Sequence, residues 1–298
     1  MLNALRFWRE RGWTVIDAAA YEQAWSRFGG SVATHPRVIE RLAGLVGLPV
    51  RYLGWQADGD IIAAVACWGR DLALSRKVLK QQGKRGFFDL GNAEVILPVA
   101  QDVRVPVRQR MSYVSELNLP FVTTLKPQAE SLALAREPED YSKKFRYNQR
   151  REQRLLEEAG AVLRPVQDFT PAELAAMYER LFQARWNFEV PGKAHLGDVF
   201  TLMREFMTGS VIMLDDRAIA IQVLYRVESP NWVSVEYVNG GVDPQQQALS
   251  PGSVLSYVNT QSAWSDARSL DKPLRYSFGR SDREYKDRWC RTVPVYKV

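Results

Sequence analysis

Cysteine and histidine are scarce in this sequence of 298 residues. The two cysteines, Cys67 and Cys290, are too few for the disulfide framework that stabilises small secreted domains. Neither His35 nor His195 has a carboxylate or thiolate at ligand spacing, so we expect no metal site. These absences argue against a disulfide-rich secreted scaffold and against a histidine-ligated metalloenzyme.

Long apolar runs and the common motifs of nucleotide and hydrolase sites are also missing. No stretch of about 18 apolar residues predicts a membrane-spanning helix. The first residues lack an apolar core followed by a small-residue cleavage site, so we expect a cytoplasmic protein without a secretory signal. The sequence has no Gly-x-Gly-x-x-Gly, no Gly-x-x-x-x-Gly-Lys-Ser/Thr and no Gly-x-Ser-x-Gly, which disfavours dinucleotide folds, P-loop proteins and serine hydrolases.

The overall composition is that of an ordinary globular protein. Hydrophobic residues make up 46% and charged residues 25% of the chain, enough for a large core. With 40 basic and 34 acidic residues the formal net charge is +6. This mild excess is compatible with a phosphate-bearing ligand, nucleic acid or an anionic membrane surface, and it requires none of them.

One order of elements occurs twice along the chain. Apolar spacing predicts helices near residues 21–28 and 36–46, followed by two apolar stretches that flank the turn Asp58-Gly59-Asp60. The same spacing predicts helices over 174–185 and 196–207, and two further strands flank Asp215-Asp216-Arg217. Helix, helix, strand, aspartate turn and strand, twice over, predicts two similar α/β units.

A basic segment separates the two units. Residues 143–154 contain six Lys or Arg side chains and predict a helix that Ser142 caps and Gly160 ends. Such a helix is either a solvated surface helix or a helix that binds phosphate groups. Further along, we expect strands over 161–163, 232–238 and 274–278, a helix over 252–268 and a final short helix over 285–289.

The segment 245–253, Gln-Gln-Gln-Ala-Leu-Ser-Pro-Gly-Ser, links a predicted strand to a predicted helix. Free amides at a helix start form an anion site suited to pyrophosphate. Because Pro251 has no amide proton, Gly252, Ser253 and Val254 would have to be the donors. The alternative is an ordinary helix start with Ser250 as N-cap and Pro251 as first residue.

Several segments together resemble one enzyme branch. Residues 142–160, the Ser-Pro-Gly-Ser start at 250–253 and the stretch 276–289 with its Tyr285-Lys286 pair are similar to the FemAB-like branch of the GNAT acyltransferases. Over its whole length the chain further resembles the Mig (macrophage-inducible gene, number fourteen) family of antimicrobial-peptide resistance proteins. This resemblance implies association with the inner membrane and resistance to polymyxin-like cationic peptides.

The resemblance implies an α/β (α+β) fold with tandem GNAT-like halves, each a mixed, mostly antiparallel sheet flanked by helices. We expect an N-terminal half over residues 14–135 and a C-terminal acyltransferase half over residues 136–298. The aromatic and arginine residues of segment 1–13 are typical of a membrane-surface segment, and a docked N-terminal helix is the alternative. The expected location is therefore the cytoplasmic face of the inner membrane, as a peripheral protein.

The resemblance also implies direct acyl or aminoacyl transfer to an amine, with acyl-CoA or aminoacyl-tRNA as donor and no tightly bound cofactor. Glu236 is the candidate base and Lys286 the candidate group that stabilises the developing charge. The GNAT pyrophosphate loop usually carries glycine where this chain has Ser250, and Pro251 lies in its amide-donating stretch; a tRNA donor tolerates this proline. Candidate contacts to the donor are Ser250, Gly252, Ser253, Arg150, Arg151, Arg280 and Arg283.

The expected acceptor is an envelope glycolipid such as lipopolysaccharide. Two interpretations of other classes stay open from the sequence. One is a non-catalytic GNAT-like scaffold that binds lipopolysaccharide or peptide at the inner membrane. The other is a nucleic-acid-binding regulator, which rests on the basic segment and the net charge alone.

Overall fold

The computed structural model describes residues 2–298, with side chains from Arg6 onward. Met1 and the side chains of Leu2 and Leu5, which belong to the expected segment 1–13, lie outside this description. Along the first part of the chain the elements are α1 (Leu2–Arg9), β1 (Trp13–Ile16), α2 (Ala18–Phe28), α3 (Pro36–Val46), β2 (Arg51–Ala57), β3 (Asp60–Trp68), β4 (Asp71–Leu72) and α4 (Arg76–Gln81).

The second part of the chain is larger. Its elements are β5 (Val114–Ser115), β6 (Lys126–Ala135), α5 (Lys143–Glu158), β7 (Val162–Pro165), α6 (Pro171–Trp186), α7 (Leu196–Leu202), β8 (Ser210–Leu214), β9 (Arg217–Glu228), β10 (Val233–Val242), α8 (Pro251–Ser269), β11 (Leu274–Arg280) and β12 (Cys290–Lys297). No helix within residues 2–298 is both long and apolar enough to cross a membrane.

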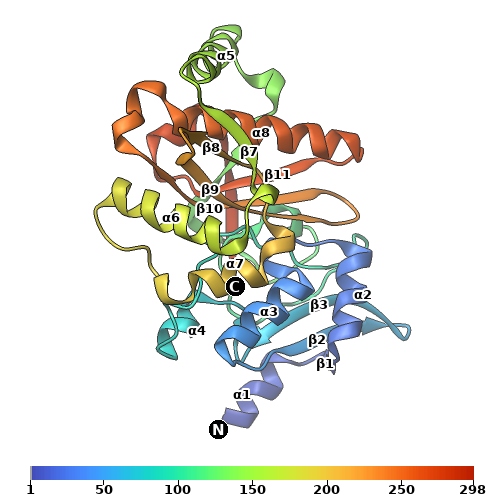
Figure 1. Cartoon of the computed structure of the whole chain (residues 1–298). Coiled ribbons are helices and arrows are strands. Elements are labelled where there is room, and N and C mark those ends of the chain that lie inside the picture. Colours follow the sequence, from blue (N-terminus) through green and yellow to red (C-terminus); the bar gives the residue numbers. More distant parts are fainter. Residues whose placement is uncertain (1) are drawn as a thin grey trace.

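The strands form two sheets (Figure 1). The smaller sheet has the order β1-β2-β3-β4, and the larger has the order β5-β12-β6-β11-β10-β9-β8-β7. Most neighbours are antiparallel, whereas β10 and β11 run parallel. The predicted α+β class with mixed, mostly antiparallel sheets flanked by helices is confirmed.

The two predicted hairpins occupy equivalent places. In the smaller sheet β1 pairs with β2 across the connection α2–α3, and in the larger sheet β7 pairs with β8 across α6–α7. Both aspartate turns use left-handed backbone at both central positions, Asp58 and Gly59 in one and Asp215 and Asp216 in the other. This geometry matches the twist of the flanking strands, which is why Asp-Gly and Asp-Asp occur there.

Alternation along β9 divides the core of the larger half into two faces. Ile221, Val223 and Tyr225 pack in the cluster that contains α6, α7 and the helices α2 and α3 of the smaller half. Ala220 packs with the first turns of α8, and Leu224 with its later turns. One face of the large sheet is therefore covered by α6 and α7 together with the N-terminal half, and the other by α8 (Figure 1).

Three strands of the larger sheet, β5, β6 and β12, were not expected. β6 pairs antiparallel with both β11 and β12, so the end of the chain returns as a strand after the short helix. The expected half 14–135 thus includes a strand that belongs to the other half's sheet. β5, which also lies within the expected half 14–135, hydrogen-bonds to β12 in the same sheet.

A buried ion pair joins the two halves. Arg275 of β11 makes a bidentate hydrogen bond with Glu94, whose side chain is 1% exposed, and its Nε lies 2.8 Å from Oε2. The same guanidinium donates to the hydroxyl of Ser115. Breaking a buried pair leaves one uncompensated charge in a medium of low polarity, which is strongly destabilising.

We expect Glu94→Gln to lower the free energy of unfolding by about 3 kcal/mol, because Arg275 would remain buried without its counter-charge. Urea denaturation of the purified protein measures this change. Glu139→Gln is the matched control, since it breaks an exposed bidentate pair with Arg268 and should have a much smaller effect. Equal effects of the two substitutions would contradict a structural role for the buried pair.

Candidate functional site

The parallel strands β10 and β11 separate part-way along their length. They pair from Val233 with Leu274 up to Glu236 with Ser277, and no further. Beyond that point β10 continues beside β9 as far as Val242, whereas β11 continues beside β6. The separation opens a wedge in the middle of the sheet, on the face that α8 covers.

A cavity of about 420 Å³ lies beside this wedge, on its β10 side. It is bounded by β10, by the first turns of α8, by the end of α6 and by the 3-10 helix η8 (Glu284–Arg288). Its polar and aromatic lining consists of Arg185, Gln222, Tyr237, Asp243, Ser253, Ser256, Tyr285, Arg288 and Trp289. Its volume is in the usual range for a small-molecule site, about 300–1000 Å³.

A bulge in β10 shapes the cavity wall. Tyr237 lies opposite Leu224 and Asn239 opposite Val223, so Val238 is the extra residue and has no partner on β9. A bulge of one residue shifts the alternation of side chains, and Tyr237, Gly240 and Val242 all line the cavity. A Cβ at Gly240 would lie 2.8 Å from the Tyr237 hydroxyl, so glycine is required for the ring to lie there.

The start of α8 has fewer free backbone amides for an anion than the sequence predicts. Ser250 occupies the N-cap position but has left-handed backbone, φ 49°, and its side chain caps no amide. The amides of Ser253 and Val254 both donate to the Ser250 carbonyl, at 3.0 and 3.1 Å. Because Pro251 has no amide proton, Gly252 is the amide of this turn that can reach a ligand.

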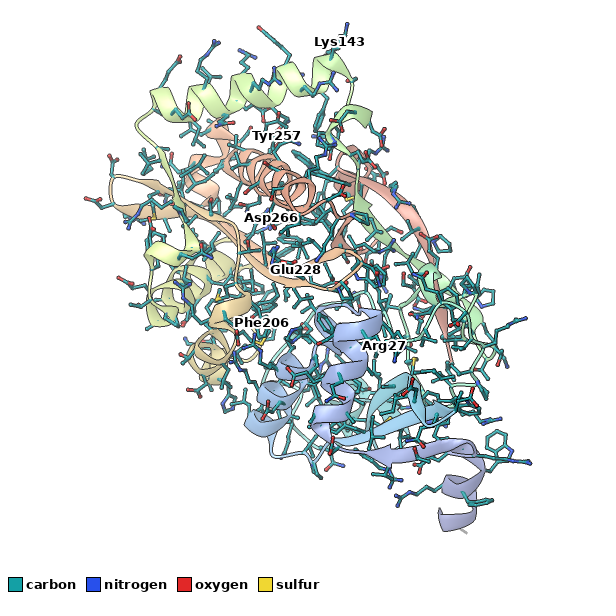
Figure 2. All side chains as sticks on the ribbon, turned by 90° about the vertical axis from the view of Figure 1, so that its right-hand side faces the viewer. Arg27, Lys143, Phe206, Glu228, Tyr257 and Asp266 are labelled. Carbon is teal, nitrogen blue, oxygen red and sulfur yellow. The ribbon has the colours of Figure 1, made fainter. Side chains whose placement is uncertain are left out.

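The basic helix α5 packs on α8 beside the cavity. The Ser253 hydroxyl donates to Gln149 at 3.3 Å, and Phe145 meets Trp289 edge to face. Ser142 caps the helix as predicted, accepting from the Phe145 amide. Arg150 and Arg151 are exposed, and Figure 2 shows Lys143 directed outward from the same helix. The helix therefore presents unobstructed positive charge next to the cavity.

Glu236 lies on the opposite face of β10 from this cavity. Its side chain is 2% exposed, and Oε1 accepts the backbone amide of Glu94 at 2.8 Å. Burial, followed by the nearby Glu94 carboxylate, raises the pKa of Glu236 well above its ordinary value. The structure therefore does not bring Glu236 to the cavity. Side chains alternate between the two faces of β10, so Tyr237 lies on the cavity face and Glu236 lies on the other.

Lys286 is held at the end of β11. Its Nζ donates to the carbonyls of Phe278 and Arg280, at 2.8 and 2.6 Å, and its neighbour Tyr285 lines the cavity. Burial lowers the pKa of the Lys286 ammonium. Arg280 pairs with Asp282 at 2.6 Å, and Arg283 is exposed. The structure thus groups Gly252 and Ser253 at the cavity, with Ser250 at the helix start beside them, and places Lys286 behind its wall.

The lining residues that were not identified from the sequence include Arg185, Tyr237 and Asp243. Arg185 donates to the Gly240 carbonyl at 3.2 Å from the last turn of α6. It continues the apolar stripe of that helix four residues after Leu181, and a charge on a buried stripe is a signal of function. Asp243 ends β10 and accepts the amide of Gln245 at 3.0 Å.

We expect Glu236→Gln to preserve the fold, because the amide oxygen can still accept from Glu94. An acid whose pKa is raised by folding ionises first in the unfolded chain, so its stabilising contribution is lost as the pH rises above the ordinary value. The stability of the variant relative to the natural protein should therefore increase between about pH 5 and about pH 8.

Urea unfolding at both pH values measures this difference, with exposed Glu22→Gln as the control. A difference between Glu236→Gln and the natural protein that does not change with pH would contradict a buried, neutral Glu236.

Comparisons with known proteins agree with this architecture. The family model described as Mig-14 matches residues 35–298. No curated protein matches the chain. FemX superimposes with a TM-score of 0.55 at 9% identity, covering 96% of both chains.

Two further solved structures share the fold. The C-terminal domain of a putative lysylphosphatidylglycerol synthetase from Agrobacterium fabrum gives a TM-score of 0.52 at 12% identity, covering 94% of this chain and 92% of that one. A conserved protein of unknown function from Bacteroides thetaiotaomicron gives 0.50 at 11% identity, covering 96% and 98%. The FemX-like fold confirms the predicted architecture, and the family match covers most of the sequence. This chain belongs to the Mig-14 family.

Proposed function

We propose that this protein transfers an acyl or aminoacyl group to an amine of an envelope component. The observation that carries the proposal is the cavity beside the point where β10 and β11 separate, with the start of α8 at its edge. A wedge between parallel strands holds a donor carbonyl in a fixed place and admits an amine to it.

The proposed reaction is direct. The amine nitrogen attacks the donor carbonyl, the carbon–nitrogen bond forms, and the ester or thioester bond to the carrier breaks. Asp243 is the carboxylate that lines the cavity, and it can take the amine proton directly or through water.

We infer that aminoacyl-tRNA is the preferred donor. A pyrophosphate of acyl-CoA would need several amides at the helix start, and Gly252 alone is free among the residues expected to donate. The exposed arginines of α5 beside the cavity suit an RNA backbone. Ser250, Ser253 and Gly252 then contact the terminal part of the donor, while Arg150, Arg151 and Arg283 contact its phosphates.

Lys286 is proposed as a positioning residue. By donating to the carbonyls of Phe278 and Arg280, it fixes η8, and with it Tyr285 and Arg288, against the end of β11. Arg280, paired with Asp282, stabilises the same corner. Loss of the lysine should displace the cavity wall and thereby lower the rate of transfer.

The proposed acceptor is a glycolipid such as lipopolysaccharide, and its modification would contribute to resistance against polymyxin-like cationic peptides. Adding an acyl or aminoacyl group changes the charge and packing of the envelope. One of the structural neighbours is itself named for lysylphosphatidylglycerol synthesis, which is a related chemistry on a lipid.

A non-catalytic scaffold at the inner membrane is the second candidate. The observation that favours it is that both side chains assigned to chemistry from the sequence, Glu236 and Lys286, are engaged by backbone groups away from the cavity. If the double variant Lys286→Ala, Glu236→Gln folds and still confers full peptide resistance, the resistance depends on neither side chain and the scaffold is favoured. A transfer assay on the same variant then separates catalysis from scaffolding.

Reversing Arg150 and Arg151 to Glu should weaken tRNA binding by about tenfold or more and flatten its dependence on salt, since fewer counterions would be released. Filter binding at several salt concentrations measures both effects. The matched control reverses Arg85 and Arg104, which are exposed elsewhere. If acyl-CoA is the donor, reversing Arg150 and Arg151 should lower the rate of transfer less than Gly252→Trp does, because the tryptophan fills the cavity. Gly44→Trp is the control, since a Cβ at Gly44 points into open space.

We also propose that α1 lies on the cytoplasmic face of the inner membrane. Phe7 is 79% and Trp8 63% exposed, with arginines on the same segment. Aromatic side chains favour the headgroup level, and arginines favour anionic lipids. Trp13, by contrast, is buried and donates to the Pro106 carbonyl, so deleting the whole segment 1–13 would also damage the fold.

We therefore expect Phe7→Ser, Trp8→Ser to abolish flotation with vesicles that contain anionic phosphatidylglycerol. The free energy of unfolding should change little, because both rings face solvent. Phe188→Ser is the control, since it removes an exposed ring elsewhere. If the natural protein fails to float, α1 is simply a docked helix.

A further inference from the structure

A second cavity, of about 470 Å³, lies between the two halves of the chain. Its walls come from the segment that follows β3, from residues 88–95 and 110–113 and from the end of β12. Ala93 and Val95 line it, and Glu94 between them donates its amide to Glu236 of β10. This hydrogen bond therefore fastens the wall of the second cavity to the face of β10 opposite the donor wedge.

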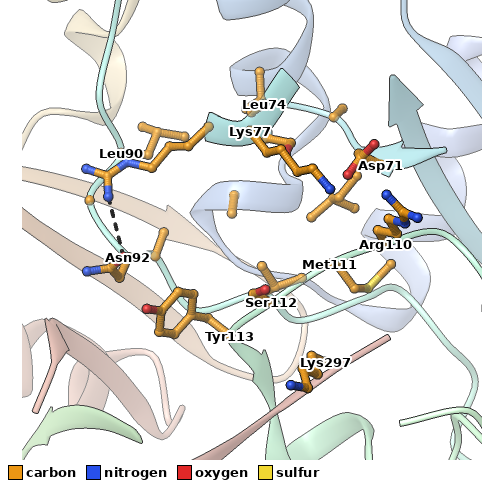
Figure 3. A pocket seen from close by; sticks show the side chains of 18 of the residues that line it. Asp71, Leu74, Lys77, Leu90, Asn92, Arg110, Met111, Ser112, Tyr113 and Lys297 are labelled. Carbon is orange, nitrogen blue, oxygen red and sulfur yellow. Dashed lines mark hydrogen bonds between the residues drawn. The ribbon is translucent and has the colours of Figure 1, made fainter. Parts of the chain in front are cut away.

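The interior of this second cavity is apolar and its edge is basic. The apolar walls are formed by Ala33, Leu72, Leu74, Phe88, Leu90 and Met111. Lys77, Arg110 and Lys297 also line it, and none of the three makes an ion pair within residues 2–298. Figure 3 shows Lys77 and Arg110 close to Asp71 at one end, with Lys297 on another wall.

The acidic groups nearby are already engaged. Asp89 holds Arg76 in a bidentate hydrogen bond, with Nε 3.1 Å from Oδ1. Asp71, which is 5% exposed, lies 3.9 Å from the guanidinium of Arg70. Three cations that form no ion pair in the described part of the chain, at the edge of an apolar space, favour a ligand with a multiply charged anionic group and an apolar body.

The backbone of the wall is strained at two places. Leu74 and Tyr113 have φ of 63° and 59°, and both line the cavity. The other non-glycine residues with positive φ in the described chain are aspartates, an asparagine and a serine, whose short polar side chains tolerate this region better. A bulky residue is rarely held in this region, and such residues cluster at ligand sites.

We propose that this cavity binds an alkyl phosphate, with the phosphate held by Lys77 and Arg110 at one end and the chain against the apolar walls. The double negative charge of a phosphate monoester suits two or three cations better than the single charge of a carboxylate does. If the proposed function holds, on which this second step rests, the ligand is a lipid-like acceptor that reaches β10 from the side opposite the donor.

Isothermal titration calorimetry of the full chain tests the site with simple probes and without any donor. We expect hexyl phosphate to bind about tenfold tighter than inorganic phosphate, because of its chain. Glucose 6-phosphate represents water-soluble phosphorylated compounds and should bind as weakly as inorganic phosphate. Equal binding of glucose 6-phosphate and hexyl phosphate would overturn the lipid-like assignment.

Two exposed cations can be removed with little risk to the fold. Lys77→Gln, Arg110→Gln should weaken hexyl phosphate binding by about tenfold or more, because the phosphate would lose its charge-assisted hydrogen bonds. The control Lys80→Gln, Arg104→Gln removes two exposed cations that do not line the cavity, and it should bind as the natural protein does.

Unchanged binding by the first variant would overturn the proposed site. Hexyl phosphate binding in a protein that transfers no group would support the site and contradict the proposed function alone, since no donor is present in the titration.

Discussion

The parallel pairing of β10 with β11, and the point at which it stops, determines most of what this protein can do. Four residue pairs hold the strands together, and beyond Glu236 and Ser277 each strand follows a different neighbour. The wedge that results would collapse if both strands were free to move. It stays open because β9 holds one strand, β6 holds the other, and α8 covers the gap.

Glu236 links the two sides of this arrangement. It accepts the Glu94 amide on the face of the N-terminal half, and its neighbour Tyr237 lines the donor cavity on the other face. Glu94 in turn holds Arg275 of β11. The pair of strands that forms the wedge is thus fastened to the segment that walls the second cavity, so two ligands on opposite faces would meet at the same strands.

The repeated local signals could be predicted from the sequence, and the long-range arrangement could not. The aspartate turns and the serine cap at Ser142 are local, and both form as expected. β6 and β12 were missed because each contains a proline, Pro127 and Pro294, and because their partners lie far away in the chain. Glu236 was assigned to the site without knowledge of which face of β10 carries the cavity.

Mass spectrometry of lipopolysaccharide and lipid extracts tests the central claim most directly. Cells that produce the natural protein are compared with cells that lack it and with cells that produce Gly252→Trp or the control Gly44→Trp. We expect one acyl or aminoacyl increment in cells with the natural protein or the control, and its loss in the other two. Identical masses in all four would contradict group transfer through the wedge between β10 and β11.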